Sequence, residues 1–294
     1  MQYAVALAET GHFGRAAEMC HVTQPGLSQQ IRQLEEHCGA PLFDRLGKSV
    51  QPTPLGRELI DRMRPILQQT EALEIFVAAQ HGQPARPIRL GVIPTVAPYL
   101  LPHAFPALQR ELPSVSFIVS ESRTDTLIDG LGNGTLDLAL IASEPKPGGP
   151  RLAIEPLFDD QFVLATGPDD KVSGPVPLDR INGNRMLLLD EGHCFREQAI
   201  AACGIEQDAA GRTFAATSLS TIVEFVANGQ GITLLPEIAL RKEASDRIRI
   251  HPLQSPGAHR QLRLVWREGS PFRKVFDSVA ETIRSARPAQ APTG

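Results

Sequence analysis

The chain has 294 residues, of which 42% are hydrophobic, so it is long enough to form two domains with apolar cores. Its formal net charge of −4 excludes binding to nucleic acid or anionic lipid through a general positive field, so any such contact must come from a local patch. The N-terminus lacks the basic and apolar segments of a signal peptide, and no apolar run approaches the roughly 20 residues of a spanning helix. We therefore expect a cytoplasmic protein with no contact to a membrane.

The N-terminal segment is typical of two short helices joined by a tight turn. The first helix is predicted over 13–20 and the second over about 24–36, with Thr23 as its N-cap and Pro25 in its first turn. An apolar stripe at i, i+4, i+7 spacing marks the buried face of the second helix: Leu27, Ile31 and Leu34. The opposite face carries polar side chains that suit base edges and phosphates in a major groove: Ser28, Gln29, Arg32 and Gln33.

Residues 41–56, PLFDRLGKSVQPTPLG, carry the turn residues of a small β-wing. With the helix pair, they predict a winged helix-turn-helix domain over 1–57 that binds double-stranded DNA. The expected DNA contacts are Thr23, Gln24, Pro25, Ser28, Gln29, Arg32, Arg45 and Lys48. This segment holds five basic and five acidic side chains, so binding cannot depend on bulk charge. The alternative is a helical hairpin whose polar face meets only water.

A long helix is predicted from about Pro54 through the linker segment 58–82. Side chains recur along it at 4-3-4-3-4 spacing, which is the pattern of a heptad seam: Leu59, Met63, Ile66, Thr70, Leu73 and Val77. A single helix packed on its own domain would show the same pattern. Because helix-turn-helix proteins usually bind two half-sites as dimers, we interpret the seam as a dimer interface.

From Ile88 onward, short β-rich runs alternate with helical stretches of about ten residues, which is typical of an α/β sheet fold. The predicted strands are IRLGVI, VSFIVS, LDLALIA, LFDDQFVLATG, MLLLD, GITLLP, IRIHPL and LRLVW. A final helix is predicted over about 271–284.

The four cysteines are too few for a disulfide scaffold, and in a reducing cytosol they should be thiols. They form no CxxC motif, and adjacent Cys-His pairs are poorly placed to bind one tetrahedral ion. We therefore expect no metal and no cofactor. Cys20 and Cys38 are expected to be packing residues of the N-terminal helices.

The segment HFGRAAEMCHVTQPGLSQQIRQLEEHCGAPLFDR, followed by TPLG, resembles the winged helix-turn-helix of LysR-type transcriptional regulators. The order of helix-turn-helix, linker helix and α/β effector domain is similar over nearly the whole chain. The resemblance implies an α/β protein whose effector domain, 83–294, has a periplasmic-binding-protein-like fold. Its two subdomains would span about 88–162 plus 267–285, and about 163–266. In most relatives a cleft between them holds a small metabolite.

Four further segments narrow the resemblance to the OxyR-like hydrogen-peroxide sensors: IPTVAPYLLP, LLLDEGHCFREQA with a later cysteine, ATSL and GQGITLLP. In that group the cysteine of the GHC motif attacks peroxide, and a cysteine nine residues later resolves it. The resemblance assigns these roles to Cys194 and Cys203. It implies a peroxide-binding set of Thr95, Thr124, His193 and Arg196.

The spacing of Cys194 and Cys203 can also be judged physically. If one helix holds both, they lie about 13.5 Å apart along its axis and on opposite faces, since nine residues rotate about 900°. A disulfide needs Cα atoms within about 7 Å, so the segment would have to rearrange before the two cysteines could bond. Such a rearrangement is what a two-state switch requires.

We therefore expect a homo-oligomeric transcription factor, a dimer through the linker helix and a tetramer in full, that activates oxidative-stress genes. RNA polymerase and a thioredoxin or glutaredoxin reductant are the implied further partners. The protein would be a stoichiometric sensor and not an enzyme. Two alternatives are a regulator that binds a small organic co-inducer, with incidental cysteines, and a thiol peroxidase, for which a DNA-binding domain has no use.

Overall fold

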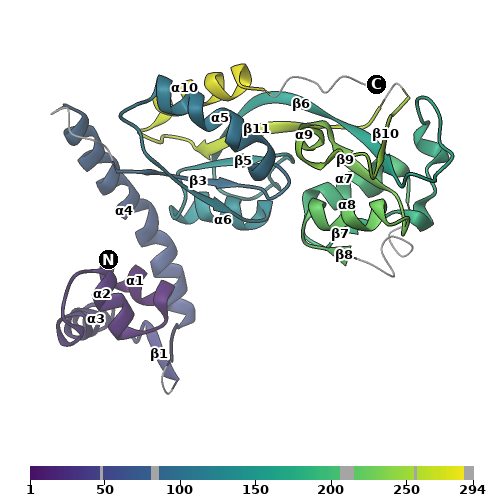
Figure 1. Ribbon diagram of the computed structural model, residues 1–294. Helices are drawn as coiled ribbons and strands as arrows, with labels where there is room; N and C mark the ends of the chain where they lie inside the picture. Colours follow the sequence, from purple (N-terminus) through teal and green to yellow (C-terminus); the bar gives the residue numbers. More distant parts are fainter. Residues whose placement is uncertain (47–48, 81–85, 206–214, 255–256, 288–294) are drawn as a thin grey trace. The chain divides into compact units, whose positions relative to one another are not determined.

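The computed structural model describes residues 1–46, 49–80, 86–205, 215–254 and 257–287. The chain divides into two compact units, Met1–Gln83 and Pro84–Gly294, whose boundary falls in the Pro- and Gly-containing segment after the long helix (Figure 1). Within the described ranges, no helix is both long enough and apolar enough to cross a membrane.

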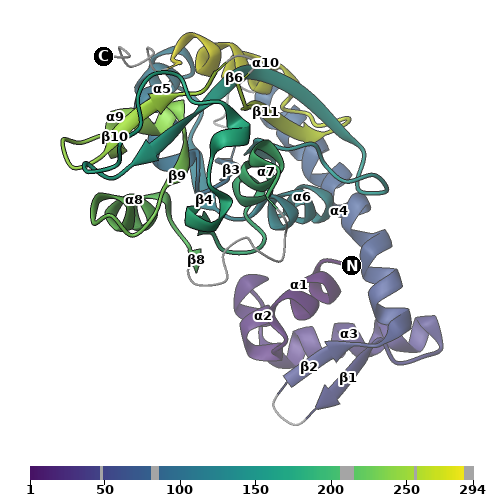
Figure 2. The same cartoon turned by 90° about the vertical axis from the view of Figure 1, so that its right-hand side faces the viewer.

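The N-terminal unit consists of three short helices, a two-stranded antiparallel hairpin and a long helix (Figure 2). These elements are α1 (Gln2–Thr10), α2 (Phe13–Met19), α3 (Gln24–Cys38), β1 (Phe43–Leu46), β2 (Ser49–Pro52) and α4 (Pro54–Gln80). Thr23 caps α3 as predicted, its hydroxyl accepting a hydrogen bond from the N–H of Gly26 at 3.3 Å. Leu27 and Ile31 are buried in the core, and Cys20 and Cys38 pack against it.

The start of α4 is locked against the hairpin by close backbone packing. A Cβ atom at Gly56 would overlap the carbonyl oxygen of Leu42, so only glycine fits at this position. Thr53 caps this turn, because its hydroxyl accepts from the N–H of Gly56 at 3.0 Å. The glycine of the TPLG motif therefore fixes the direction in which the long helix leaves the domain.

The seam along α4 is only partly covered within the unit. Met63 is buried at 5% exposure, whereas Ile66, Leu73 and Val77 are 48%, 63% and 48% exposed. The prediction of one continuous helix is confirmed over 27 residues. Its N-terminal half packs on its own domain, and the seam in its C-terminal half exposes apolar side chains.

The C-terminal unit is built on a seven-stranded mixed sheet with strand order β10-β6-β11-β5-β3-β4, and β9 also pairs with β6. Its strands are β3 (Ile88–Val92), β4 (Phe117–Glu121), β5 (Leu138–Ile141), β6 (Leu152–Thr166), β9 (Thr233–Pro236), β10 (Arg249–Pro252) and β11 (His259–Arg267). A separate parallel pair is formed by β7 (Leu188–Leu189) and β8 (Ala215–Ala216). The helices are α5 (Ala97–Glu111), α6 (Thr124–Asn133), α7 (Cys194–Cys203), α8 (Leu219–Ala227), α9 (Leu240–Glu243) and α10 (Arg273–Ser285), with short 3-10 turns at Leu178–Arg180, Gly183–Arg185 and Glu237–Ala239.

The long strand β6 joins the two halves of this unit (Figure 1). Its first part, up to Gln161, pairs with β11, and its last part, from Phe162, pairs with β9 and β10. Since β11 also pairs with β5, it belongs to the first half. This pairing differs from the expected subdomain over about 163–266, because that range includes β11. A strand that pairs far back along the chain cannot be assigned from local pattern alone.

Candidate functional site

The helix that carries both candidate cysteines begins after a sharp turn. β7 ends at Leu189, and Gly192 follows with φ of 87°, a conformation that disfavours other residues. A Cβ at Gly192 would also lie 2.9 Å from Nη1 of Arg123. Cys194 is the first residue of α7, where backbone N–H groups favour an anion. The glycine of the GHC motif therefore sets the thiol at the start of a helix.

The two cysteines occupy opposite ends of α7, and both are free, partly buried thiols. A helix of this length separates them by about 13.5 Å along its axis, so they cannot bond while it is intact. Burial raises the pKa of Cys203 to about 11, so this group is a protonated thiol at neutral pH. The structure thus shows one helix that holds both cysteines, which is the condition on which the spacing argument depends.

A pocket of about 420 Å³ opens beside Cys194, between α7, the start of α6 and the loop after β5. Thr124 lines it and is 9% exposed, and its hydroxyl oxygen has no hydrogen-bond partner among the described residues. A buried hydroxyl without a partner is costly, and a small polar ligand would satisfy it. The pocket can therefore present a thiol and a free hydroxyl to one small molecule.

Thr95 is held by a buried arginine. Its Oγ1 accepts a hydrogen bond from Nη1 of Arg260 at 2.8 Å, and its carbonyl accepts one from Nη2 at 2.9 Å. Arg260 also donates to Asp160 at 2.9 Å, and its guanidinium lies 5.3 Å from the ring centroid of Phe195. Because its oxygen accepts from a cation, the Thr95 hydroxyl proton is free to be donated elsewhere. The arginine thus links Thr95 to the residue that follows Cys194.

Arg260 and Asp160 were not among the predicted site residues. Their side chains are fully buried, at 0% exposure each. One sequence signal was available: Arg260 alternates with the buried Leu262 and Leu264, so it occupies a core-facing position of a strand. A charged residue at such a position is buried only when it is paired.

His193 is buried beside the turn. Burial lowers its pKa, and the carboxylate of Asp190 opposes this effect. Its Nε2 lies 2.9 Å from Oδ1 of Asp190, at ion-pair distance, although the two atoms are not aligned as a hydrogen bond. Oδ2 of Asp190 accepts from Nη2 of Arg123 at 2.7 Å. His193 is therefore a mostly neutral imidazole next to Cys194.

The remaining predicted residues lie around this centre and not in it. Arg196 is half-buried and donates to the carbonyl of Leu189 at 3.0 Å, which ties the first turn of α7 to β7. The described lining of the pocket includes Thr124 and Cys194 but not the other predicted residues, which are Thr95, His193, Arg196 and Cys203. Across the described ranges, no group of three or more His, Cys, Asp or Glu side chains could hold a metal ion.

The predicted DNA contacts lie on α3, its N-cap and the hairpin. Most are exposed: Thr23, Gln24, Pro25, Gln29, Arg32 and Arg45. Ser28 is half-buried, and Lys48 lies outside the described residues. The guanidinium of Arg45 lies 5.2 Å from the ring centroid of Phe13, so the hairpin is anchored to α2.

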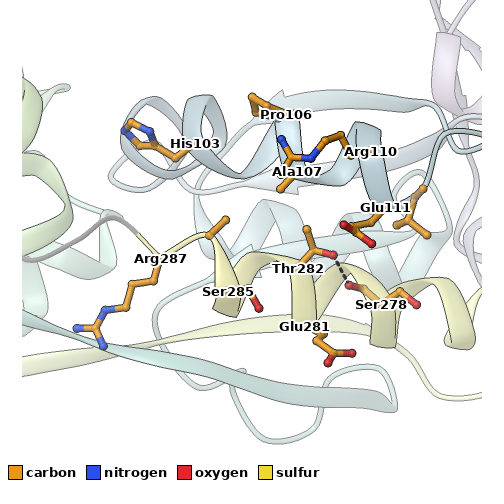
Figure 3. A pocket seen from close by; sticks show the side chains of 12 residues that line it. His103, Pro106, Ala107, Arg110, Glu111, Ser278, Glu281, Thr282, Ser285 and Arg287 are labelled. Carbon is orange, nitrogen blue, oxygen red and sulfur yellow. Dashed lines mark hydrogen bonds between the residues drawn. The ribbon is translucent and has the colours of Figure 1, made fainter.

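A larger pocket of about 660 Å³ lies between α5 and α10 (Figure 3). Charged side chains of both signs line it, together with His103: Arg110, Glu111, Glu281 and Arg287. It shares no described residue with the pocket beside Cys194 and contains none of the predicted site residues.

Comparison with known proteins places both halves of the chain. Residues 1–57 match the bacterial regulatory helix-turn-helix protein of the lysR family, and residues 81–288 match the LysR substrate binding domain. The chain is 39% identical over 292 residues to the DNA-binding transcriptional dual regulator OxyR of Escherichia coli, covering 97% of this chain and 94% of that protein. It is 37% identical over 287 residues to the hydrogen peroxide-inducible genes activator of Haemophilus influenzae, covering 96% and 94%.

Solved structures agree with these relatives. A full-length OxyR variant from Pseudomonas aeruginosa superposes with a TM-score of 0.81 at 33% identity, covering 96% of each chain. A hydrogen-peroxide-bound cysteine variant of OxyR from Corynebacterium glutamicum gives a TM-score of 0.64 at 29% identity, covering 97% of this chain and 90% of that one. The chain therefore belongs to the LysR family of bacterial transcription regulators and, within it, to the OxyR group.

Proposed function

We propose that this protein is a DNA-binding transcription regulator that senses hydrogen peroxide through a reversible disulfide between Cys194 and Cys203. The observation that carries the proposal is the position of Cys194 at the start of α7, in one pocket with the unpartnered hydroxyl of Thr124. The second thiol, Cys203, lies at the other end of the same helix. The OxyR relatives support the assignment.

The proposed oxidation by peroxide proceeds in two steps. The Cys194 thiolate attacks one peroxide oxygen, the O–O bond breaks, and the second oxygen leaves as water after it takes up a proton, so Cys194 becomes a sulfenic acid. Thr124, which lines the pocket with Cys194, is the first group proposed to orient the peroxide. Thr95, His193 and Arg196 lie around the pocket and are proposed to assist once the peroxide is bound. The Cys203 sulfur then attacks the sulfenic sulfur, the S–S bond forms, and water leaves.

The second step requires α7 to open. Cys203 is too distant to react within the helix, and its raised pKa keeps it protonated while it is buried. Unwinding brings the sulfurs together and removes the burial that raises this pKa. Oxidation therefore selects a different local fold, and this change is the signal that the effector domain passes on.

The wider assignment follows from the fold. The N-terminal unit would bind operator DNA through α3 and the hairpin, and the exposed seam of α4 would join two chains, with a tetramer as the full assembly. In this proposal the protein activates oxidative-stress genes in the cytoplasm together with RNA polymerase. A thioredoxin or glutaredoxin would reduce the disulfide. The protein is consumed once per oxidation event, as a sensor and not as a turnover enzyme.

The test is a free-thiol count and intact mass before and after one equivalent of peroxide. The reduced parent should lose two of its four thiols and two hydrogens. Cys203→Ser should stop at a sulfenic acid on Cys194, and Cys194→Ser should keep its thiols. Four unchanged thiols in the parent would contradict the proposal and leave a regulator that responds to an organic co-inducer.

A further inference from the structure

The charged side chains that line the pocket beside Cys194 are mainly acidic, and all of them are exposed, so they lie at its opening, the mouth of the pocket. Four carboxylates and one cation line it: Asp125, Asp129, Glu144, Glu197 and Lys146. Asp125 and Glu144 are both strongly exposed, with side-chain exposures of 72% and 80%. A reactant that reaches the thiol through this pocket therefore comes close to these charges.

Two of the carboxylates have nearby cations that reduce their field. Lys146 Nζ lies 2.9 Å from Asp125, and Arg263 lies 3.2 Å from Glu144. Asp129 and Glu197 are exposed and form no ion pair within the described part of the chain. They come from opposite walls, Asp129 from α6 and Glu197 from the first turn of α7. Lys146 also acts on Glu197 electrostatically, so the four carboxylates share two cations, Lys146 and Arg263. The pocket opening therefore keeps a net negative charge, and Asp129 and Glu197 are its carboxylates outside the ion pairs.

The pocket has an independent mark of a ligand site, the unpartnered hydroxyl of Thr124. This side chain is more than nine-tenths buried and lines the same space as Cys194. A hydroxyl can both donate a hydrogen bond to a small reactant such as hydrogen peroxide and accept one from it. The hydroxyl therefore marks a ligand site, and discrimination by charge is left to the carboxylates at the mouth.

The positive groups near the thiol lie outside the described lining of the pocket. Arg123 is paired with Asp190, Arg196 is tied to the carbonyl of Leu189, and the N-terminus of α7 faces Cys194. Because each guanidinium already has a hydrogen-bond partner and neither lines the pocket, we expect their effect on an incoming reactant to be weaker than that of the lining groups. The rim carboxylates act on the incoming reactant, so their effect depends on its charge.

We propose that the acidic rim, through Asp129 and Glu197, selects the reactants of Cys194 by charge. Neutral hydrogen peroxide enters freely, whereas anionic peroxides and anionic thiol or disulfide compounds are disfavoured. The inference rests on the proposed role of Cys194 as the reactive thiol. It makes these two carboxylates determinants of specificity, although neither takes part in the bond changes.

The test uses charged thiol reagents on the full-length chain. In a variant with Cys20→Ser, Cys38→Ser and Cys203→Ser, Cys194 is the remaining thiol. Its thiolate attacks the sulfenyl sulfur of a methanethiosulfonate, a mixed disulfide forms, and methanesulfinate leaves with the electron pair. Rates are measured with the cationic trimethylammonioethyl, the anionic sulfonatoethyl and the neutral methyl reagent. Each rate is divided by that of a small free thiol.

The cationic reagent should react about tenfold faster than the anionic one at low ionic strength. Asp129 and Glu197 should each change either rate by roughly 1.5-fold, which is about fivefold in the ratio for the pair, and the other charges of the opening account for the remaining factor of about two. Asp129→Asn with Glu197→Gln should reduce this ratio to about twofold, and salt should reduce it in the parent. Asp246→Asn, which removes an exposed carboxylate outside the pocket, should leave the ratio unchanged. The rate with the neutral reagent corrects each variant for changes in access to Cys194 and in the fraction of Cys194 that is thiolate.

A ratio near one in the parent, or a ratio that the double substitution does not change, would overturn the proposal. This result does not depend on whether the protein senses peroxide, because the reagents require neither peroxide nor a disulfide with Cys203. Peroxide can oxidise Cys194 with no charge preference among reagents. Equally, a charge preference can be present in a thiol that peroxide does not oxidise.

Discussion

His21 occupies the turn of the helix-turn-helix with φ of 55°, in the left-handed region that favours glycine. This strained conformation allows a tight turn. In the turn, the N–H of His21 donates to the carbonyl of Glu18 at 3.1 Å, and the N–H of Val22 donates to the carbonyl of Ala17 at 3.0 Å. The side chain of His21 is exposed and adds no core packing. The other contacts of the turn must therefore offset the free energy of its backbone strain.

We therefore predict that His21→Gly stabilises the N-terminal unit by about 0.5–1 kcal/mol, since glycine removes the strain at the cost of a more flexible unfolded chain. Urea denaturation of the full-length protein checks this. His37→Gly is the matched control, because His37 lies exposed within α3 and glycine there should destabilise by about 1 kcal/mol. Equal effects of the two substitutions would show that backbone strain at His21 is unimportant.

At the scale of elements, α4 raises the question of what covers its seam. Ile66, Leu73 and Val77 expose apolar surface that a lone helix would leave in water. We predict that Leu73→Glu converts the assembly toward monomers, because a carboxylate in a heptad seam is buried without a partner. Sedimentation should show the smaller species, and operator affinity should fall by at least tenfold, because two half-sites are no longer bound together.

The control for this prediction is Gln69→Glu, which adds the same charge at an exposed position of α4 outside the seam. It should leave the assembly intact. If the Leu73→Glu protein sediments like the parent, the seam of α4 is not the dimer interface.

Local signals were sufficient to predict most elements but not their partners. The cap at Thr23 and the stripe of Leu27 and Ile31 identify α3, and every predicted β-rich run contains a strand. β8 was missed, because a pair of alanines carries no strand pattern. The pairing of β11 with β5 was also missed, because register across a distant connection is decided by packing.

At the scale of the whole molecule, the site is made by contacts that no local pattern encodes. Arg260 and Thr95 are 165 residues apart in sequence, yet they form two hydrogen bonds beside the point where β6 passes from one half of the sheet to the other. The sequence motif around Cys194 is sufficient to propose this residue as the reactive thiol, and that assignment stays a prediction. The buried ion pair of Arg260 and Asp160 depends on the fold, so it became visible only in three dimensions.

A second long-range contact joins the two halves of the C-terminal unit. Tyr99 on α5 donates to Oε1 of Glu243 on α9 at 2.8 Å, and Ser220 on α8 donates to the same oxygen at 2.6 Å. We predict that Tyr99→Phe destabilises this unit by about 1–3 kcal/mol, because a buried carboxylate loses a donor. Tyr3→Phe, which changes the other tyrosine of the chain, is the control, with urea denaturation as the measurement.

The pH dependence of stability provides a sharper test of the same contact. Burial, aided by the hydrogen bond to Glu243, raises the pKa of Tyr99 well above its ordinary value of 10.0. A phenol whose folded pKa is raised contributes stability that is fully present below pH 10 and is lost as the pH rises, because only the unfolded chain releases the proton there. The gap in unfolding free energy between the parent and Tyr99→Phe should therefore narrow above about pH 10. A gap that stays constant through this range would mean that the phenol proton is not what joins α5 to α9.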